Sequence, residues 1–113
     1  MKKKEIIVRC WIDIDGMRFF GPGRLELLSL IDESGSIAKA AKAMGMSYKK
    51  AWDMVDDMNT RGKKPLLVAR KGGDKGGGTE LTDTGRKMIA KYGKLMTKLN
   101  SIVEKNGDIL NLV

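Results

Sequence analysis

SIAKAAKAMGMSYKKAWDMVDDMN, residues 36–59, is the stretch that decides the fold. It predicts two short helices with a turn of only three residues between them. Ser36 and Ser47 are good N-cap residues for these helices, and Gly45 permits a left-handed backbone at the turn. Apolar residues are spaced so that one face of each helix is buried against the other. The pattern predicts a helix-turn-helix with residues 47–59 as the recognition helix, and an ordinary helical hairpin is the alternative.

Two strand-like pieces, LLVAR at 66–70 and TELT at 79–82, follow this stretch and enclose the loop KGGDKGGG at 71–78. A hairpin directly after a helix-turn-helix predicts a winged helix. The loop does not complete a nucleotide-binding P-loop, because Thr79 and Glu80 stand where lysine and serine or threonine are required. We expect a wing tip whose amides and lysines approach phosphate closely, and a flexible loop without contacts is the alternative.

The segments on either side complete the fold. EIIVRCWIDI at 5–14 alternates apolar and polar residues, which predicts a strand, and Asp15-Gly16 is a hairpin turn signal before a returning strand at 17–20. These elements predict an α+β fold: a winged helix-turn-helix with an N-terminal β-hairpin and a long C-terminal helix. We expect one domain over residues 1–113, with the N-terminal hairpin at 5–20, three helices at 24–60, the wing at 66–82 and a dimerisation helix at 83–105.

Composition narrows the function. The net charge is +8 and the pI about 9.7, which favours an anionic partner, nucleic acid first. The sequence contains no histidine, so most zinc sites and all histidine-based catalysis are excluded. We expect no enzyme, no catalytic residues, no metal and no cofactor. The start of the chain resembles neither a signal peptide nor a membrane span, and Cys10 is the single cysteine, so we expect a cytoplasmic protein and no membrane partner.

Three stretches carry a family resemblance: FGPGRLELLSLIDESGSI at 20–37, GMSYKKAWDMVDDMN at 45–59 and KGGDKGGGTELTDTG at 71–85. Together they resemble the N-terminal DNA-binding domain of the ModE-type molybdate-responsive transcriptional regulators, whose winged helix is related to the LysR type. The resemblance covers most of the chain and implies a homodimeric, DNA-binding transcription regulator. The molybdate-binding C-terminal domains of that family have no counterpart in this sequence, so we expect no molybdate site in this chain.

Candidate contacts to double-stranded DNA lie at the start of the first helix of the motif, on the recognition helix and its C-terminal end, and on the wing. Lys49 and Lys50 occupy the first turn of the recognition helix, the part that enters the major groove in this motif, although a solvated helix face is the alternative. Trp52 is either a base contact or, as we favour, a packing residue against a neighbouring element, and Asp53 could accept from cytosine N4. The complete predicted set is Ser36, Lys39, Ser47, Tyr48, Lys49, Lys50, Trp52, Asp53, Arg61, Arg70, Lys71, Lys75, Gly76 and Gly77.

The last helix carries apolar residues at heptad spacing, which predicts a seam for a partner subunit. The predicted dimerisation residues are Met88, Tyr92, Leu95, Met96, Leu99 and Ile102. A helix packed only on its own core is the alternative. The sequence therefore predicts a transcriptional regulator that binds an inverted-repeat duplex site as a homodimer. A non-specific nucleic-acid-binding or architectural protein is the second hypothesis, and a partner-binding adaptor is the third.

Overall fold

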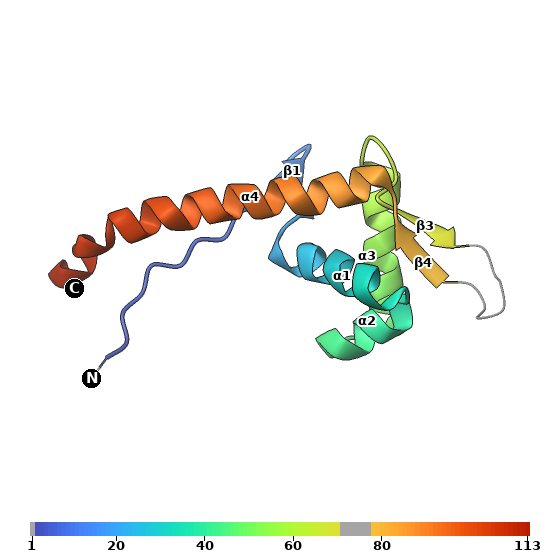
Figure 1. Ribbon diagram of the computed structural model, residues 1–113, viewed down its shortest axis with the longest axis horizontal. Coiled ribbons are helices and arrows are strands. Elements are labelled where there is room, and N and C mark those ends of the chain that lie inside the picture. Colours follow the sequence, from blue (N-terminus) through green and yellow to red (C-terminus); the bar gives the residue numbers. More distant parts are fainter. Residues whose placement is uncertain (1, 71–77) are drawn as a thin grey trace.

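The computed structural model describes residues 2–70 and 78–113 and has the predicted mixture of helices and small hairpins (Figure 1). The helices α1, α2 and α3 lie together at one end, and α4 leaves them and runs to the opposite end. In chain order the elements are β1 (Ile12–Ile14), β2 (Met17–Phe20), α1 (Pro22–Ser34), α2 (Ile37–Met44), α3 (Tyr48–Arg61), β3 (Leu67–Arg70), β4 (Gly78–Leu81), α4 (Asp83–Lys105) and the 3-10 helix η1 (Gly107–Leu112).

The N-terminal hairpin is shorter than predicted. Its turn is the expected one, since Asp15 and Gly16 both have positive φ, at 51° and 78°, as a type I′ turn requires. β1, however, pairs with β2 only from Ile12 onward, with a shift of register after that residue. The prediction of a strand over 5–14 is therefore wrong for residues 5–11. A strand needs a partner for its backbone groups, and the returning strand has only four residues.

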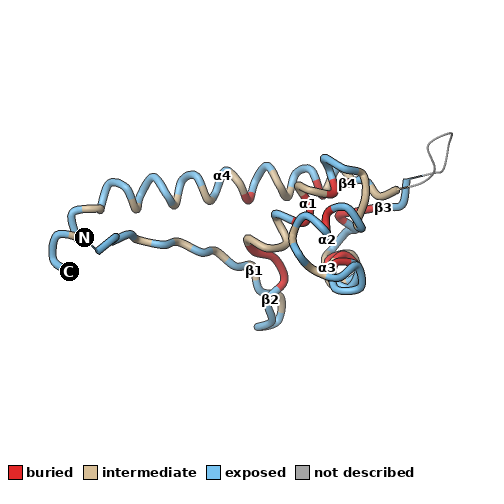
Figure 2. Tube along the Cα trace, turned by 90° about the horizontal axis from the view of Figure 1, so that it is seen from below, coloured by how far each residue is buried: buried red, intermediate tan, exposed pale blue. Residues whose placement is uncertain are grey.

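The alternation of apolar and polar residues over 5–14 nevertheless predicts correctly which side chains are half-buried. Ile6, Val8 and Cys10 are half-buried, while Ile7 and Arg9 between them are exposed. This extended segment runs on the same side of the molecule as the far half of α4, as Figure 2 shows, and Cys10 packs against the core. An apolar surface of α4 thus replaces the neighbouring strand that the sequence pattern suggested.

The helix ends follow from local chemistry. The side chain of Ser36 accepts a hydrogen bond from the backbone nitrogen of Lys39, and that of Ser47 accepts one from Lys50, so both predicted N-caps are confirmed. Gly45 has φ of 68° and ends α2 in the left-handed conformation that the tight turn needs. α1 begins at Pro22, two residues before the predicted start, because proline fits the first turn of a helix.

The core lies where the three short helices meet β2, the wing and the first half of α4 (Figure 2). Ala40 and Ala51 are almost completely buried at the crossing of α2 and α3, which lets these helices approach closely. Most of the surface of the far half of α4, in contrast, is exposed to solvent. The largest fully buried side chains are Phe20, Leu27, Leu28, Ile31, Met58 and Leu67. Among the described residues, no helix is both long and apolar enough to span a membrane.

Candidate nucleic-acid interface

The recognition helix α3 has one buried face and one open face. Ala51 and Met58 are fully buried against the core, whereas Tyr48 is 56% exposed and Trp52 47% exposed. The whole first turn, including Ser47, Lys49 and Lys50, is exposed. The end of α3 that a helix-turn-helix presents to DNA is therefore accessible, as the sequence predicted.

Lys49 and Asp53, two predicted DNA contacts, are paired with each other. The ammonium nitrogen of Lys49 lies 3.1 Å from a carboxylate oxygen of Asp53, one helical turn away. Their side chains are 84% and 54% exposed, so water screens the pair and it contributes on the order of 0.3–0.5 kcal/mol to stability. An ion pair this weak exchanges readily for a phosphate or a base edge.

Trp52 borders the wing without being covered by it. The residue lines a shallow groove together with Leu67 and Val68 of β3, while nearly half of its side-chain surface remains open. Our interpretation of Trp52 as a packing residue that seals α3 against a neighbour is therefore only partly right. The neighbour exists, and it is β3, but the ring is accessible from solvent.

The N-terminus of α2 lies beside this groove. Ser36 and Tyr48 line a second hollow, together with Gly78 and Thr79 of β4. The Ser36 hydroxyl serves as the α2 cap, and Lys39 in the first turn of α2 is exposed. The structure thus brings the starts of α2 and α3 and the base of the wing together, and three predicted residues, Ser36, Tyr48 and Trp52, line the hollows between them. Lys39, Ser47, Lys49 and Lys50 are exposed in the first turns of the same two helices or at their N-caps.

The wing is fixed to the helices by two contacts that the sequence analysis did not identify. The side-chain oxygen of Asn59 accepts hydrogen bonds from the backbone nitrogens of Leu66 and Leu67, and its nitrogen donates to the Leu67 oxygen. On the other strand, the Thr79 nitrogen donates to the backbone oxygen of Gly35 over 3.0 Å. An asparagine in the last turn of the predicted helix is the one feature of the sequence that could have indicated this role.

Arg70 lies at the open end of β3, where it pairs with Gly78 of β4. Its guanidinium group covers two glycines: a Cβ atom on Gly35 would lie 2.9 Å from Nη2, and one on Gly78 would lie 2.8 Å from it. Arg70 thus packs over the junction between α1 and the wing. The remaining predicted wing contacts, Lys71, Lys75, Gly76 and Gly77, lie outside the described residues.

The profile of the bacterial regulatory helix-turn-helix protein, lysR family, matches residues 23–86, from α1 into the first turn of α4. The chain belongs to this family. A crystal structure of a LysR family transcriptional regulator superposes with a TM-score of 0.55 at 19% identity, covering 75% of this chain and 28% of that one. This likeness supports the winged helix-turn-helix fold.

Longer relatives match this lysR-family chain. It is 39% identical over 113 residues to the molybdenum transport protein ModE of Azotobacter vinelandii, covering 100% of this chain and 42% of the relative. It is 40% identical over 93 residues to the DNA-binding transcriptional dual regulator ModE of Escherichia coli K12, covering 82% of this chain and 34% of the relative. The chain therefore spans about two fifths or less of the length of these relatives, and the resemblance to ModE-type regulators is confirmed.

Arg61, a predicted DNA contact of this lysR-family chain, has another set of partners. Its guanidinium lies 2.9 Å from the carboxylate of Asp57, donates to the backbone oxygen of Arg18 and lies over the Phe19 ring. Arg24 approaches the same carboxylate oxygen at 2.5 Å. Arg61 therefore joins α3 to β2, and its side chain is largely withdrawn from solvent.

This cluster also explains why Asp57, an acidic residue of α3, is ionised inside the protein. Partial burial alone would raise the pKa of Asp57, but the hydrogen bonds and positive charges of Arg24 and Arg61 outweigh it and hold the pKa below 3.8. Asp57 is consequently charged at neutral pH and balanced within the protein. It adds little repulsion toward a nucleic-acid backbone.

The predicted dimerisation residues of α4 fall into two groups. Tyr92 is buried, its ring contacts Phe20 edge-on at a centroid distance of 5.1 Å, and its hydroxyl donates to the Cys10 oxygen. Met88 and Met96 are half-buried against the same core. Leu95 and Ile102, in contrast, are 42% and 57% exposed. The first group belongs to the chain's own core, whereas Leu95 and Ile102 form an exposed apolar strip. Leu99, the sixth predicted residue, is half-buried.

Proposed function

We propose that this chain binds double-stranded DNA at a specific sequence and acts as a transcriptional regulator. The single observation that carries the proposal is the open first turn of α3 in a lysR-family helix-turn-helix. In this motif the N-terminal residues of the second helix contact base edges in the major groove. Lys49 and Lys50 supply the charge, and Lys71 and Lys75, which lie outside the described residues, are proposed contacts to the backbone or the minor groove.

The proposed active form is a homodimer that binds an inverted repeat. The far part of α4 exposes Leu95 and Ile102, two turns apart on one edge of the helix. Burial of such side chains against a second copy would stabilise a twofold arrangement. Two recognition helices held in this way reach major grooves about 34 Å apart, which is one turn of DNA.

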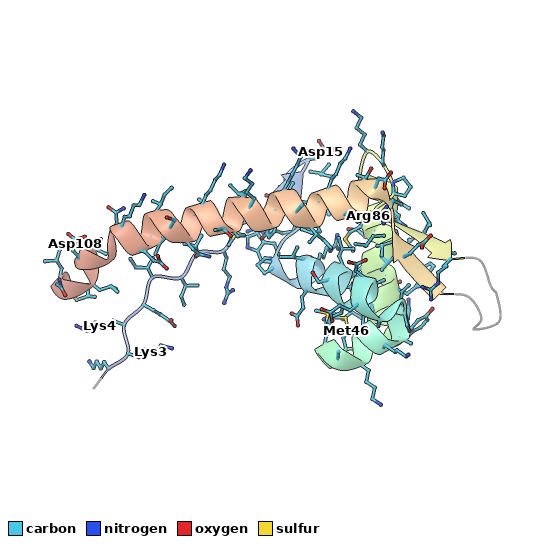
Figure 3. The ribbon with its side chains drawn as sticks, in the orientation of Figure 1. Lys3, Lys4, Asp15, Met46, Arg86 and Asp108 are labelled. Atoms are coloured by element: carbon cyan, nitrogen blue, oxygen red, sulfur yellow. The ribbon has the colours of Figure 1, made fainter. Side chains whose placement is uncertain are left out.

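The basic residues at the other end of the molecule are not part of this interface. Lys3 and Lys4 lie below the far end of α4, at the same end of the molecule as Asp108 and opposite the wing (Figure 3). The ammonium group of Lys4 donates to the backbone oxygen of Val113. The proposed DNA contacts are therefore concentrated on α3, the start of α2 and the wing.

The net charge of +8 also favours a second function, non-specific binding to nucleic acid. Selection of bound sequences from a random duplex library separates the two. A specific regulator yields an enriched inverted repeat that binds at least about 10³-fold more tightly than random duplex at the same salt concentration. Enrichment of no sequence would reject the regulator and leave the non-specific function.

Two further properties complete the proposal. A bacterial regulator meets its DNA in the cytoplasm, and we place this chain there, without an enzymatic activity. The expectation that the chain holds no molybdate site stays a prediction, although one relative is named a molybdenum transport protein. Calorimetric titration with molybdate tests it, and saturable heat at micromolar concentration would contradict it.

A further inference from the structure

The groove between α3 and the wing is apolar and open. Trp52 forms one wall, Leu67, Val68 and Ala69 of β3 form the other, and Ile37 and Thr79 close one end. Ile37 and Thr79 also line the neighbouring hollow beside Tyr48, so the two depressions are adjacent. Three apolar side chains along it, Tyr48, Trp52 and Val68, keep 40% or more of their surface exposed.

The Asn59 side chain and the Thr79 backbone nitrogen, two polar groups of this groove, are occupied by hydrogen bonds within the protein. Asn59 lies at its edge, but its side-chain oxygen accepts from two backbone nitrogens and its side-chain nitrogen donates to the Leu67 oxygen. The Thr79 nitrogen is bonded to Gly35, and no charged residue lines the groove. Six of its eight lining residues are apolar, so the groove is suited to contact with an apolar group.

One base-edge group in the major groove of DNA is apolar, and this is the C5-methyl group of thymine. We propose that Trp52, with Val68 opposite, reads thymine by contact with this methyl group. The inference rests on the proposed function and names the base that this part of the interface selects. Duplex DNA is the fitting occupant because the groove adjoins the exposed first turn of α3, where Lys49 and Lys50 lie, and because the chain carries a charge of +8.

The test replaces single thymines by deoxyuridine, which removes only the methyl group, in the tightest duplex recovered from the random library. Affinities are measured by fluorescence anisotropy at one salt concentration. The unmodified protein should lose about fourfold in affinity at one or more thymines of each half-site, the effect of one buried methyl group. In Trp52→Ala the same replacement should change the affinity less than twofold.

Two controls keep the test specific. Trp11 has a similarly exposed ring, at 45%, but lies against Gly21 outside the groove, so Trp11→Ala should keep the full methyl effect. Circular dichroism checks that the variants fold. If Trp52→Ala does not fold, Val68→Thr keeps the shape of the groove, replaces one methyl group by a hydroxyl and should reduce the methyl effect.

The outcomes decide between the inference and the proposed function. A selected repeat whose affinity is indifferent to every deoxyuridine replacement overturns thymine reading and leaves specific DNA binding intact. A methyl effect that persists in folded Trp52→Ala assigns this residue to packing and also overturns the inference. Absence of any selected sequence rejects the proposed function and the inference together.

Discussion

The hydroxyl group of Tyr92 donates a hydrogen bond to the backbone oxygen of Cys10 over 2.6 Å. This contact joins the middle of α4 to the extended N-terminal segment across 82 positions of the sequence. It lies beside the edge-on packing of the Tyr92 ring against Phe20, within the core. The long helix is thus anchored to its own chain at this point, and Met96, one turn farther on, is the last of its residues that packs against the core.

Replacing Tyr92 by phenylalanine should lower the free energy of unfolding by about 1 kcal/mol. The ring and its contact with Phe20 remain, but the hydrogen bond is lost and the Cys10 oxygen loses its donor. Urea denaturation measures the change. Tyr48→Phe is the matched control, because that hydroxyl belongs to a side chain 56% exposed and its loss should leave stability unchanged. Equal stability of both variants would show that the Tyr92 bond contributes nothing.

Replacing Asp57 by asparagine should destabilise the protein by about 1–3 kcal/mol near neutral pH. The change leaves the partly buried guanidinium groups of Arg24 and Arg61 without their counter-charge. Asp56 is exposed and forms no ion pair among the described residues, so Asp56→Asn is the neighbouring control.

The Asp57 contribution should also depend on pH. Its pKa is lowered in the folded protein relative to 3.8, so the unfolded chain takes up the proton first as pH falls. The stabilisation is therefore complete above pH 3.8 and is lost as pH falls through the lower, folded-state pKa. Urea denaturation of the wild type and Asp57→Asn over this range should show the two stabilities converging below pH 3.8. A constant difference down to the lowest pH would contradict the ion-pair explanation.

Replacing Lys49 by alanine should weaken binding to the selected duplex by about 1–3 kcal/mol if a base contact is lost. Stability should change by no more than about 0.5 kcal/mol, because the pair with Asp53 is exposed. Anisotropy titration and thermal unfolding give the two numbers. Lys98→Ala, on the exposed surface of α4, is the control for a simple loss of charge. Full affinity in the combined Lys49→Ala and Lys50→Ala variant would remove the first turn of α3 from the interface.

The sequence predicted the helix-turn-helix well because its determinants are local. Ser36 and Ser47 cap the helices that follow them directly, and Gly45 sets the turn from its own backbone conformation. The strand at 5–14 was overextended, since its length depends on a partner strand elsewhere in the chain. The alternating pattern could not distinguish a neighbouring strand from the apolar side of α4.

The residues whose roles were missed act across long sequence distances. Arg61, predicted as a DNA contact, forms hydrogen bonds to backbone oxygens of β2 that lie 43 and 44 positions earlier, and no local pattern in the sequence indicates these bonds. Tyr92 has the heptad spacing of a subunit seam and yet packs on Phe20. Periodicity identifies the apolar side of α4. Which of its turns are buried within the same chain depends on how the other elements pack against the helix.

This division of α4 gives a sharper test of the homodimer. Leu95 and Ile102 are exposed, and in a twofold dimer each would be buried twice, with about 1.5–3 kcal/mol for each fully buried side chain. Leu95→Lys combined with Ile102→Lys should therefore give a folded monomer with much weaker affinity for the inverted repeat. Sedimentation velocity measures the subunit state, and circular dichroism measures the fold.

Tyr92→Lys is the contrasting variant, because it places a charge in the chain's own core and should unfold the protein rather than separate two subunits. Lys98→Ala should leave both the subunit state and the fold unchanged. The Leu95 and Ile102 double variant should therefore be a folded monomer, and Tyr92→Lys should be unfolded. All three positions lie on the same predicted seam. A wild-type chain that sediments as a folded monomer at tens of micromolar would refute the dimer and assign Leu95 and Ile102 another partner.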